Sequence, residues 1–261
     1  MHKLGHTRSA HRRDHLLQTP DSFVRIPLPC LTKAMAIVHT GSAAGAAFTE
    51  FTVELEAGGV LSSAGLQRFV YVLEGELTLR ASNEERRMKP GSFAYVPASV
   101  THRFVSESEG RAVVIERRAR PGDAASQPHD GAPRSRDAAL VEGGTALTVG
   151  REEDCAPAPL MGDDDVRVRS LMPEGVAYDF AVNTMTYQPG ASLSMVEVHV
   201  MEHGLLMLAG GGIYRLGDEW YPVQAGDFIW MAPFCPQWFG AIGKQPAKYL
   251  IYKDWNQHPL P

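Results

Sequence analysis

"FVYVLEGELTLRASNEERRMKPGSFAYVPASVTHRF" at residues 69–104 recurs as "GLLMLAGGGIYRLGDEWYPVQAGDFIWMAPFCPQWF" at residues 204–239, at a shift of 135 positions and without a gap. Identities at this shift include Gly75 with Gly210, Arg80 with Arg215, Glu84 with Glu219, Gly91 with Gly226, Phe93 with Phe228 and Phe104 with Phe239. Glycines fall on glycines where turns need backbone freedom, which chance identities would not do. The chain is therefore a tandem duplication of one unit.

Each unit consists of short apolar or alternating runs broken by Gly, Pro, Asn and Asp, such as "FTEFTVEL" and "KYLIYKDW". This texture predicts an all-β barrel or sandwich. A glycine, about fifteen residues, and then Pro-Gly or Ala-Gly before a phenylalanine resemble the cupin pattern, and a cupin is a small double-sheet jelly roll. The duplication then predicts a tandem cupin (bicupin), with two double-stranded β-helix jelly-roll barrels.

Changes in composition and hydrophobic pattern along the chain also predict domain boundaries. We expect an N-terminal segment over 1–33, an N-terminal cupin without a metal site over 34–120, a linker over 121–153 and a metal-binding C-terminal cupin over 154–261. The linker is predicted because Pro, Gly, Ala, Ser and Asp dominate much of that stretch and aromatic residues are few.

Composition excludes several classes of function. The net charge is −5 with scattered positive residues, so neither nucleic acid nor an anionic membrane is an expected partner, and a small molecule is. Three distant cysteines predict neither a disulfide framework nor a thiolate metal site. No apolar region follows the basic start of the chain, and no run approaches about 18 apolar residues. We expect a cytoplasmic protein without a membrane span.

The stretch "EVHVMEHGLLMLAGG" (197–211) raises a choice between helix and strand. His199 to His203 matches the H-x-x-E-H pattern of inverted zinc peptidases, which need a helix. Alternating valines upstream and the glycines at 204 and 210–212 downstream favour strands instead. In a strand Glu197 and His199 point to one side and the valines to the other, and a turn then allows His203 to begin the next strand.

The spacing resembles the first cupin motif, H-x-H, three or four residues, E, six residues, G, with glutamate and histidine exchanged. A second motif, "APFCPQWF", places Gln237 where the last cupin histidine usually falls. The predicted ligands are Glu197, His199, His203 and Gln237, although each alone could be an ordinary polar surface residue. Nitrogen and oxygen donors without thiolate leave Mn, Fe, Ni or an open catalytic Zn possible.

The duplication provides an internal control for the metal prediction. At a shift of 135 the four ligands fall on Ser62, Ala64, Arg68 and His102. One imidazole does not hold a divalent ion, so we expect no metal in the first unit. Its expected role is packing, dimerisation or closure of the second barrel, and His102 is expected to be a satisfied polar residue.

The last strand carries two further candidates. Tyr249, Ile251 and Lys253 share one face of "KYLIYKDW", and the neighbouring residues share the other. From spacing alone, Tyr249 could equally belong to the core and Lys253 to solvent. Tyr214 is a barrel aromatic by default.

The stretch from Glu197 to Phe239, followed by "YLIYKDWN", is similar to the (S)-ureidoglycine aminohydrolases, bicupins of purine and allantoin degradation, also known in bacteria as glyoxylate-induced proteins. The similarity is close over 180–257 and weaker in the first half. It implies Mn(II) on Glu197, His199, His203 and Gln237, and substrate contacts from Tyr214, Tyr249 and Lys253. It further implies a homo-oligomer that converts (S)-ureidoglycine to (S)-ureidoglycolate and ammonia. Our hypothesis for this reaction is that Glu197, Lys253 and Tyr249 are the catalytic residues.

Two other classes of function remain open from the sequence. A metal-dependent cupin oxygenase or isomerase could use the same ligands on another small acid. A non-enzymatic, ligand-binding cupin could dispense with the metal.

Overall fold

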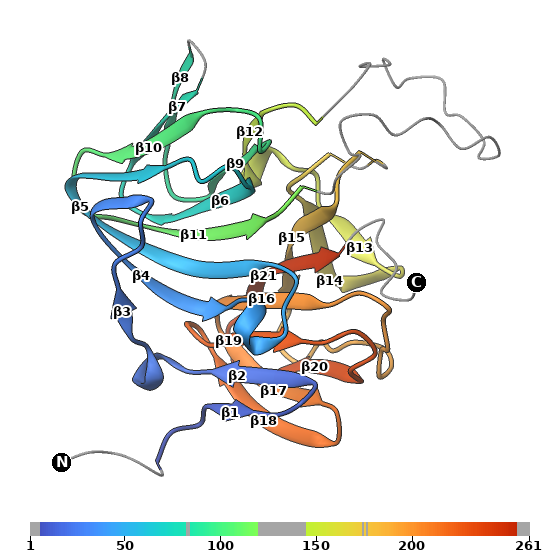
Figure 1. Ribbon diagram of the computed structural model, residues 1–261. Coiled ribbons are helices and arrows are strands. Elements are labelled where there is room, and N and C mark those ends of the chain that lie inside the picture. Colours follow the sequence, from blue (N-terminus) through green and yellow to red (C-terminus); the bar gives the residue numbers. More distant parts are fainter. Residues whose placement is uncertain (1–5, 82–83, 120–144, 174, 176, 255–261) are drawn as a thin grey trace, which may run out of the picture.

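The computed structural model describes residues 6–81, 84–119, 145–173, 175 and 177–254, and it stacks two β-barrels (Figure 1). The first barrel contains β3 (Arg25–Ile26), β4 (Leu31–Thr40), β5 (Thr49–Ser62), β6 (Gln67–Glu74), β7 (Leu77–Ala81), β8 (Glu84–Met88), β9 (Ser92–Val96), β10 (His102–Ser106) and β11 (Gly110–Arg117). The second contains β13 (Ala158–Leu160), β14 (Asp163–Ser170), β15 (Phe180–Tyr187), β16 (His203–Ala209), β17 (Gly211–Leu216), β18 (Glu219–Gln224), β19 (Phe228–Met231), β20 (Gln237–Ala241) and β21 (Ala247–Asp254). The predicted all-β class with two barrels is confirmed. No helix in the described ranges is long and apolar enough to cross a membrane.

The duplication holds strand by strand. Strands β6 to β11 recur as β16 to β21, close to the shift of 135 positions that the sequence gives. Gly75 and Gly210 both adopt positive φ, at 74° and 64°. A Cβ on Gly210 would lie 2.5 Å from the carbonyl oxygen of Pro246, so only glycine fits this turn without strain.

The two barrels exchange edge strands, which the sequence analysis did not anticipate. Strand β2 (His15–Gln18), from the start of the chain, pairs with β19 of the second barrel. Strand β12 (Thr148–Arg151), which follows residues 121–144 outside the described ranges, pairs with β9 of the first barrel. Figure 1 shows the blue β2 beside the orange strands and the yellow-green β12 beside the green ones. Short strand β1 (Ala10–His11) continues the second sheet beyond β2.

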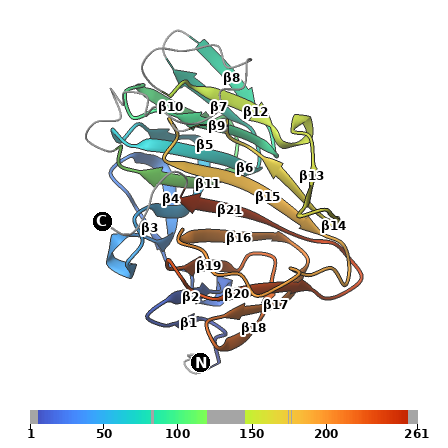
Figure 2. The ribbon, with the colours of Figure 1, turned by 90° about the vertical axis from the view of Figure 1, so that its right-hand side faces the viewer.

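Figure 2 shows strands β15, β21, β16, β19 and β2 in the order in which they pair to form one sheet. Each barrel has its own apolar interior, and a third core lies between the barrels. The last strand serves two of these cores. Tyr249 and Ile251 face the interior of the second barrel, whereas Leu250 and Tyr252 pack in the core between the barrels. This alternation confirms the two faces predicted for the strand.

Arg68 fills the interior of the first barrel where the second carries its predicted ligands. The Arg68 guanidinium donates to the Ser62 carbonyl oxygen at 2.8 Å and contacts His102 Nε2 at 2.9 Å. Its Nε donates to Glu116 Oε1 at 2.8 Å. Ser62 and His102 align with Glu197 and Gln237, so the side chain of Arg68 supplies a cation at the equivalent place. His102 also contacts the Val100 carbonyl oxygen at 2.8 Å and is a satisfied polar residue, as predicted.

We expect Arg68→Met to destabilise the protein strongly. The change leaves the Glu116 carboxylate, 8% exposed, without its cation, and breaking such a buried pair costs about 3–5 kcal/mol. The double variant Arg68→Met/Glu116→Leu should recover most of this loss, because it also removes the unpaired charge. Chemical denaturation measures both, and a single variant as stable as the parent would contradict a role for this ion pair.

Glu50 is a second buried acid, on the side of β5 that meets the second barrel. It is 1% exposed, and its Oε2 has no hydrogen-bond partner in the described residues. A Cβ placed on Gly204 of β16 would lie 2.6 Å from that oxygen. Burial raises the pKa of Glu50 from an ordinary value near 4.5 to about 8. The side chain is therefore protonated in the folded protein at neutral pH.

We expect Glu50→Gln to stabilise the protein in alkaline but not in acidic solution. Because the folded pKa is raised, the contribution of Glu50 is fully present below about pH 4.5 and is lost as pH rises toward about 8. Within that window the variant should gain up to about 1.4 kcal/mol per pH unit over the parent. Thermal melts of both proteins between pH 4.5 and 9 measure the difference, and parallel melting curves would refute the assignment.

Candidate metal centre

The predicted ligands lie at one end of the second barrel, where a loop crosses β20. Glu197 and Gln237 form an isolated β-bridge, with Glu197 N donating to Gln237 O at 2.8 Å and Gln237 N to Glu197 O at 2.9 Å. This bridge ties the loop that carries Glu197 and His199 to the first residue of β20. A carboxylate and a carboxamide are thus held on paired backbone positions.

The two imidazoles lie beside this pair. His199 Nε2 is 3.1 Å from Glu197 Oε2, and the rings of His199 and His203 are 5.2 Å apart between centroids. His203 begins β16 and is 3% exposed, and its Nδ1 has no hydrogen-bond partner in the described residues. Burial, aided by the nearby charges of His199 and Lys253, lowers the pKa of His203 to about 3. The ring is therefore neutral, the form in which imidazole binds a metal.

The loop itself differs from the regular strand predicted for "SMVEVHV". Within the described ranges, Glu197 is the one residue of this stretch with β-pairing, and its partner is the first residue of β20. The predicted facing of the side chains nevertheless holds: Glu197 and His199 are half-buried, whereas Val198 is 56% exposed. The chain bends at Val200 and Met201, and β16 starts at His203, as expected.

Glu202 rules out the peptidase pattern. Its carboxylate accepts hydrogen bonds from Ala47 N at 2.9 Å and Trp230 Nε1 at 3.1 Å, in the region between the barrels. It lies directly before β16 and not on a helix, and its two hydrogen bonds show that the glutamate of H-x-x-E-H takes part in packing between the domains.

The structure brings the three predicted substrate contacts toward these ligands. Tyr214 donates its hydroxyl hydrogen to Gln237 Oε1 at 3.0 Å. Tyr249 is 2% exposed and shares a core with Tyr214. Lys253 is the direct cross-strand partner of His203 in the pairing of β21 with β16, which sets both side chains on the same face of the sheet. Burial raises the pKa of both tyrosines, so they are protonated donors at neutral pH.

Two residues of β15 extend this site, and the sequence analysis missed them. The Tyr187 hydroxyl is 2.8 Å from the Tyr249 hydroxyl, and both side chains are buried. With its amide turned, Asn183 accepts from Lys253 Nζ at 3.0 Å. Both residues lie in "AVNTMTYQPG", a stretch for which the sequence analysis predicts no site residue. Their alternation with Met185 on one strand face was the available signal.

Three other side chains bring potential metal-binding atoms closer together than the predicted ligands do. Among the described residues, Asp14, His15 and Cys235 form the group of three such side chains whose donor atoms lie within 4.8 Å of one another; Glu197, His199 and His203 are spaced more widely. The His15 ring is already bonded at both nitrogens, by Asp14 at 2.9 Å and the Tyr221 hydroxyl at 2.9 Å. These hydrogen bonds hold β2 against the second barrel, so the close spacing of the three side chains has a structural explanation. Cys30, Cys155 and Cys235 are all free.

Residues 51–116 and 183–252 each match the family model described as "Cupin domain", which agrees with the two barrels observed. By fold and by repeated domain, the protein is a two-domain cupin. An (S)-ureidoglycine aminohydrolase of Arabidopsis thaliana is 40% identical over 98% of this chain and 80% of that protein. One of Escherichia coli K12 is 27% identical over 92% of this chain and 88% of that protein.

The chain belongs to the (S)-ureidoglycine aminohydrolase family. A solved structure titled as a putative glyoxylate induced protein from Pseudomonas aeruginosa is also similar. It has a TM-score of 0.79 and 27% identity over 97% of this chain and 93% of that one. The family resemblance drawn from the second half of the sequence is confirmed over nearly the whole chain.

Proposed function

We propose that this chain is a Mn(II)-dependent hydrolase that converts (S)-ureidoglycine and water to (S)-ureidoglycolate and ammonia. Two observations support this choice of substrate. The relatives are named for this activity, and their similarity extends over more than nine tenths of this chain. In the reaction the bond from the α-carbon to the amino nitrogen breaks, and a bond from the same carbon to a water oxygen forms.

The donor set fits a divalent first-row ion. Glu197, His199, His203 and Gln237 offer one carboxylate, two imidazoles and one amide oxygen, and none of them is a thiolate. The observation that carries the proposal is the buried, neutral His203 beside a second imidazole, which in turn contacts the Glu197 carboxylate. When bound, a divalent ion would supply Lewis-acid polarisation of the substrate's oxygen and nitrogen atoms. Mn(II) is our choice among several ions that such donors accept.

The protein residues would position the substrate and move protons. Lys253 carries a positive charge on the His203 side of the barrel, where it would orient the substrate carboxylate. Tyr249, held by Tyr187 at 2.8 Å, would donate a hydrogen bond to the same group. Tyr214 orients the Gln237 amide, which fixes the direction of its oxygen. Glu197 would accept a proton from water in addition to its role as ligand.

The decisive experiment measures metal content and ammonia release together on freshly generated ureidoglycine. We expect one equivalent of Mn(II) per chain, ammonia in proportion to substrate consumed, and (S)-ureidoglycolate as the product. Removal of the metal by a chelator should abolish turnover, and added Mn(II) should restore it. Oxygen uptake with Fe(II) and no release of ammonia would select an oxygenase instead. If the metal-free protein binds ureidoglycine fully and neither form turns it over, the protein is a non-enzymatic cupin.

A further inference from the structure

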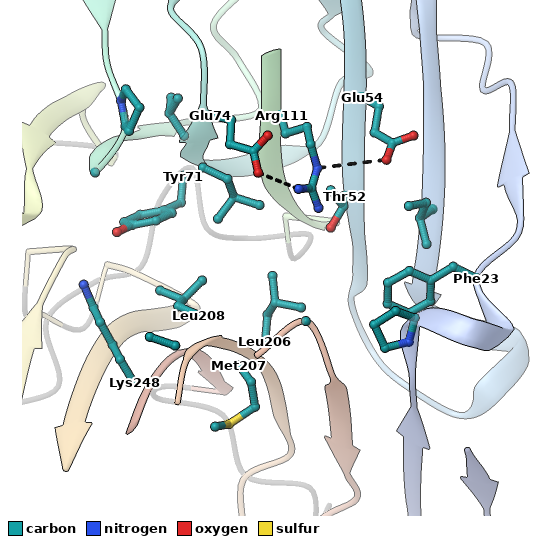
Figure 3. Close-up of a pocket in the computed structure, with 18 of the residues that line it drawn as sticks. Phe23, Thr52, Glu54, Tyr71, Glu74, Arg111, Leu206, Met207, Leu208 and Lys248 are labelled. Atoms are coloured by element: carbon teal, nitrogen blue, oxygen red, sulfur yellow. Dashed lines mark hydrogen bonds and ion pairs between the residues drawn. The ribbon is translucent and has the colours of Figure 1, made fainter. Parts of the chain in front are cut away.

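A cavity of about 670 Å³ lies between the two barrels, outside the candidate metal centre. Its floor is β16, with Leu206 and Leu208 on the face opposite to the barrel interior (Figure 3). Val72 and Ile37 of the first barrel and Phe23 of the N-terminal segment line other sides. Pockets of this size and apolar character at domain junctions are typical of small-molecule sites.

Arg111 provides the polar rim of this cavity, between two carboxylates (Figure 3). Its Nη1 donates to Glu74 Oε1 at 2.7 Å, whereas its Nε lies 4.0 Å from Glu54 Oε1. That Nε is buried and has no hydrogen-bond partner among the described residues. Glu54 is instead engaged by Arg25, at 2.6 and 3.0 Å.

A buried N–H donor without a partner is costly, so an acceptor atom of a ligand would be bound favourably at Arg111 Nε. The charges around it select the kind of acceptor. Two arginines face two glutamates here, and Lys248, which also lines the cavity, is paired with Glu152 at 2.7 Å, so these charges balance. A carboxylate bound at Nε would lie close to Glu54 and be repelled, and a cation would be repelled by Arg111 and Arg25. A neutral carbonyl oxygen avoids both penalties.

The carboxylates of Glu54 and Glu74 would accept hydrogen bonds from a ligand that also carries N–H groups. A carboxamide or urea group presents an acceptor and donors side by side, which matches the alternation of Arg111 with Glu54 and Glu74. The apolar floor would take a flat hydrocarbon or ring on the other end of the molecule. We infer that the cavity between the barrels binds a neutral small molecule with a carboxamide or urea group and an apolar body, held by Arg111.

Benzamide and benzoate test this inference, because they share a ring and differ in charge. With leucine methyl groups labelled for NMR in the metal-loaded protein, benzamide should shift the signals of Leu206 and Leu208, with a Kd on the order of 1 mM for a probe of this size. Benzoate should bind at least about tenfold more weakly, since Glu54 and Glu74 repel it. Arg111→Met should weaken benzamide by about tenfold, as expected for the loss of one charged hydrogen-bond donor. Arg80→Met is the matched control, because Arg80 is an exposed arginine paired with Glu85 at 2.9 Å and lies outside the cavity.

Glu74→Gln is a second variant that keeps the test independent of the folding of Arg111→Met. Neutralising this carboxylate should narrow the gap between benzamide and benzoate by about threefold or more. Benzoate as tight as benzamide in the parent protein would overturn the inference. So would shifts confined to Leu205 and Leu216, which lie inside the second barrel, or the absence of any shift at about tenfold the expected Kd. None of these results bears on ammonia release, so the proposed function is judged separately.

Discussion

His203→Ala is expected to remove both the metal and the hydrolysis of ureidoglycine. His203 is the most buried of the predicted ligands. The ring of His199 lies 5.2 Å away at 73° to it, so it would not replace the lost donor atom. Loss of the Lewis acid should lower kcat/KM by at least about 10³-fold, since such polarisation is worth several kcal/mol and each 1.36 kcal/mol is a factor of ten. Metal analysis after dialysis and the ammonia assay measure the two effects on the same sample.

The control for this prediction is His102→Gln in the first barrel. His102 aligns with the predicted ligand Gln237, but its two ring nitrogens contact Arg68 and the Val100 carbonyl oxygen. Metal content and turnover should both stay at the parental level in this variant. Full Mn(II) occupancy in His203→Ala, or loss of metal in His102→Gln, would place the metal elsewhere than we propose.

Lys253→Met is expected to lower kcat by about 10² to 10⁴-fold while the metal stays bound, the range typical of a side chain that transfers a proton. The reason is its place opposite His203 on β21, where its ammonium group is supported by Asn183. If Lys253 only orients the carboxylate, the loss should appear mainly in KM, because binding is then weakened without a change in the proton transfer. Steady-state kinetics at constant metal content separate these two roles.

Lys244→Met is the matched control, since Lys244 is exposed in the loop before β21. It removes the same charge from the same region and should leave both constants unchanged. Parental kinetics in Lys253→Met would exclude that lysine from the mechanism and leave Tyr249 and Glu197 as the candidates for proton transfer.

The fold and most of the candidate site could be predicted from local pattern. Period-two alternation placed Tyr249 and Ile251 on one face and Leu250 and Tyr252 on the other, and the structure puts these pairs in two different cores. The same reasoning placed Glu197 and His199 on a common side, although the loop makes only a single bridge instead of a strand. A run of β-branched residues predicts an extended backbone, but it does not reveal whether a partner strand is present.

Contacts between segments that are distant in the sequence could not be predicted from local pattern. Strands β2 and β12 each have four residues, and their partners β19 and β9 lie in the opposite barrel. Nothing in so short a run specifies which edge it joins. Tyr187 and Asn183 were missed for the same reason, since their importance comes from Tyr249 and Lys253 on a neighbouring strand.

The sequence by itself determined the duplication, the β class and the residue types of the candidate ligands, because turn glycines and side-chain alternation are local properties of the backbone. Only the tertiary structure decided that Arg68 supplies the cation of the first barrel, that Glu202 joins the two domains and that a cavity opens behind β16. These features depend on contacts between side chains that are far apart in the sequence. Their hydrogen bonding and burial are therefore fixed only by the folded structure.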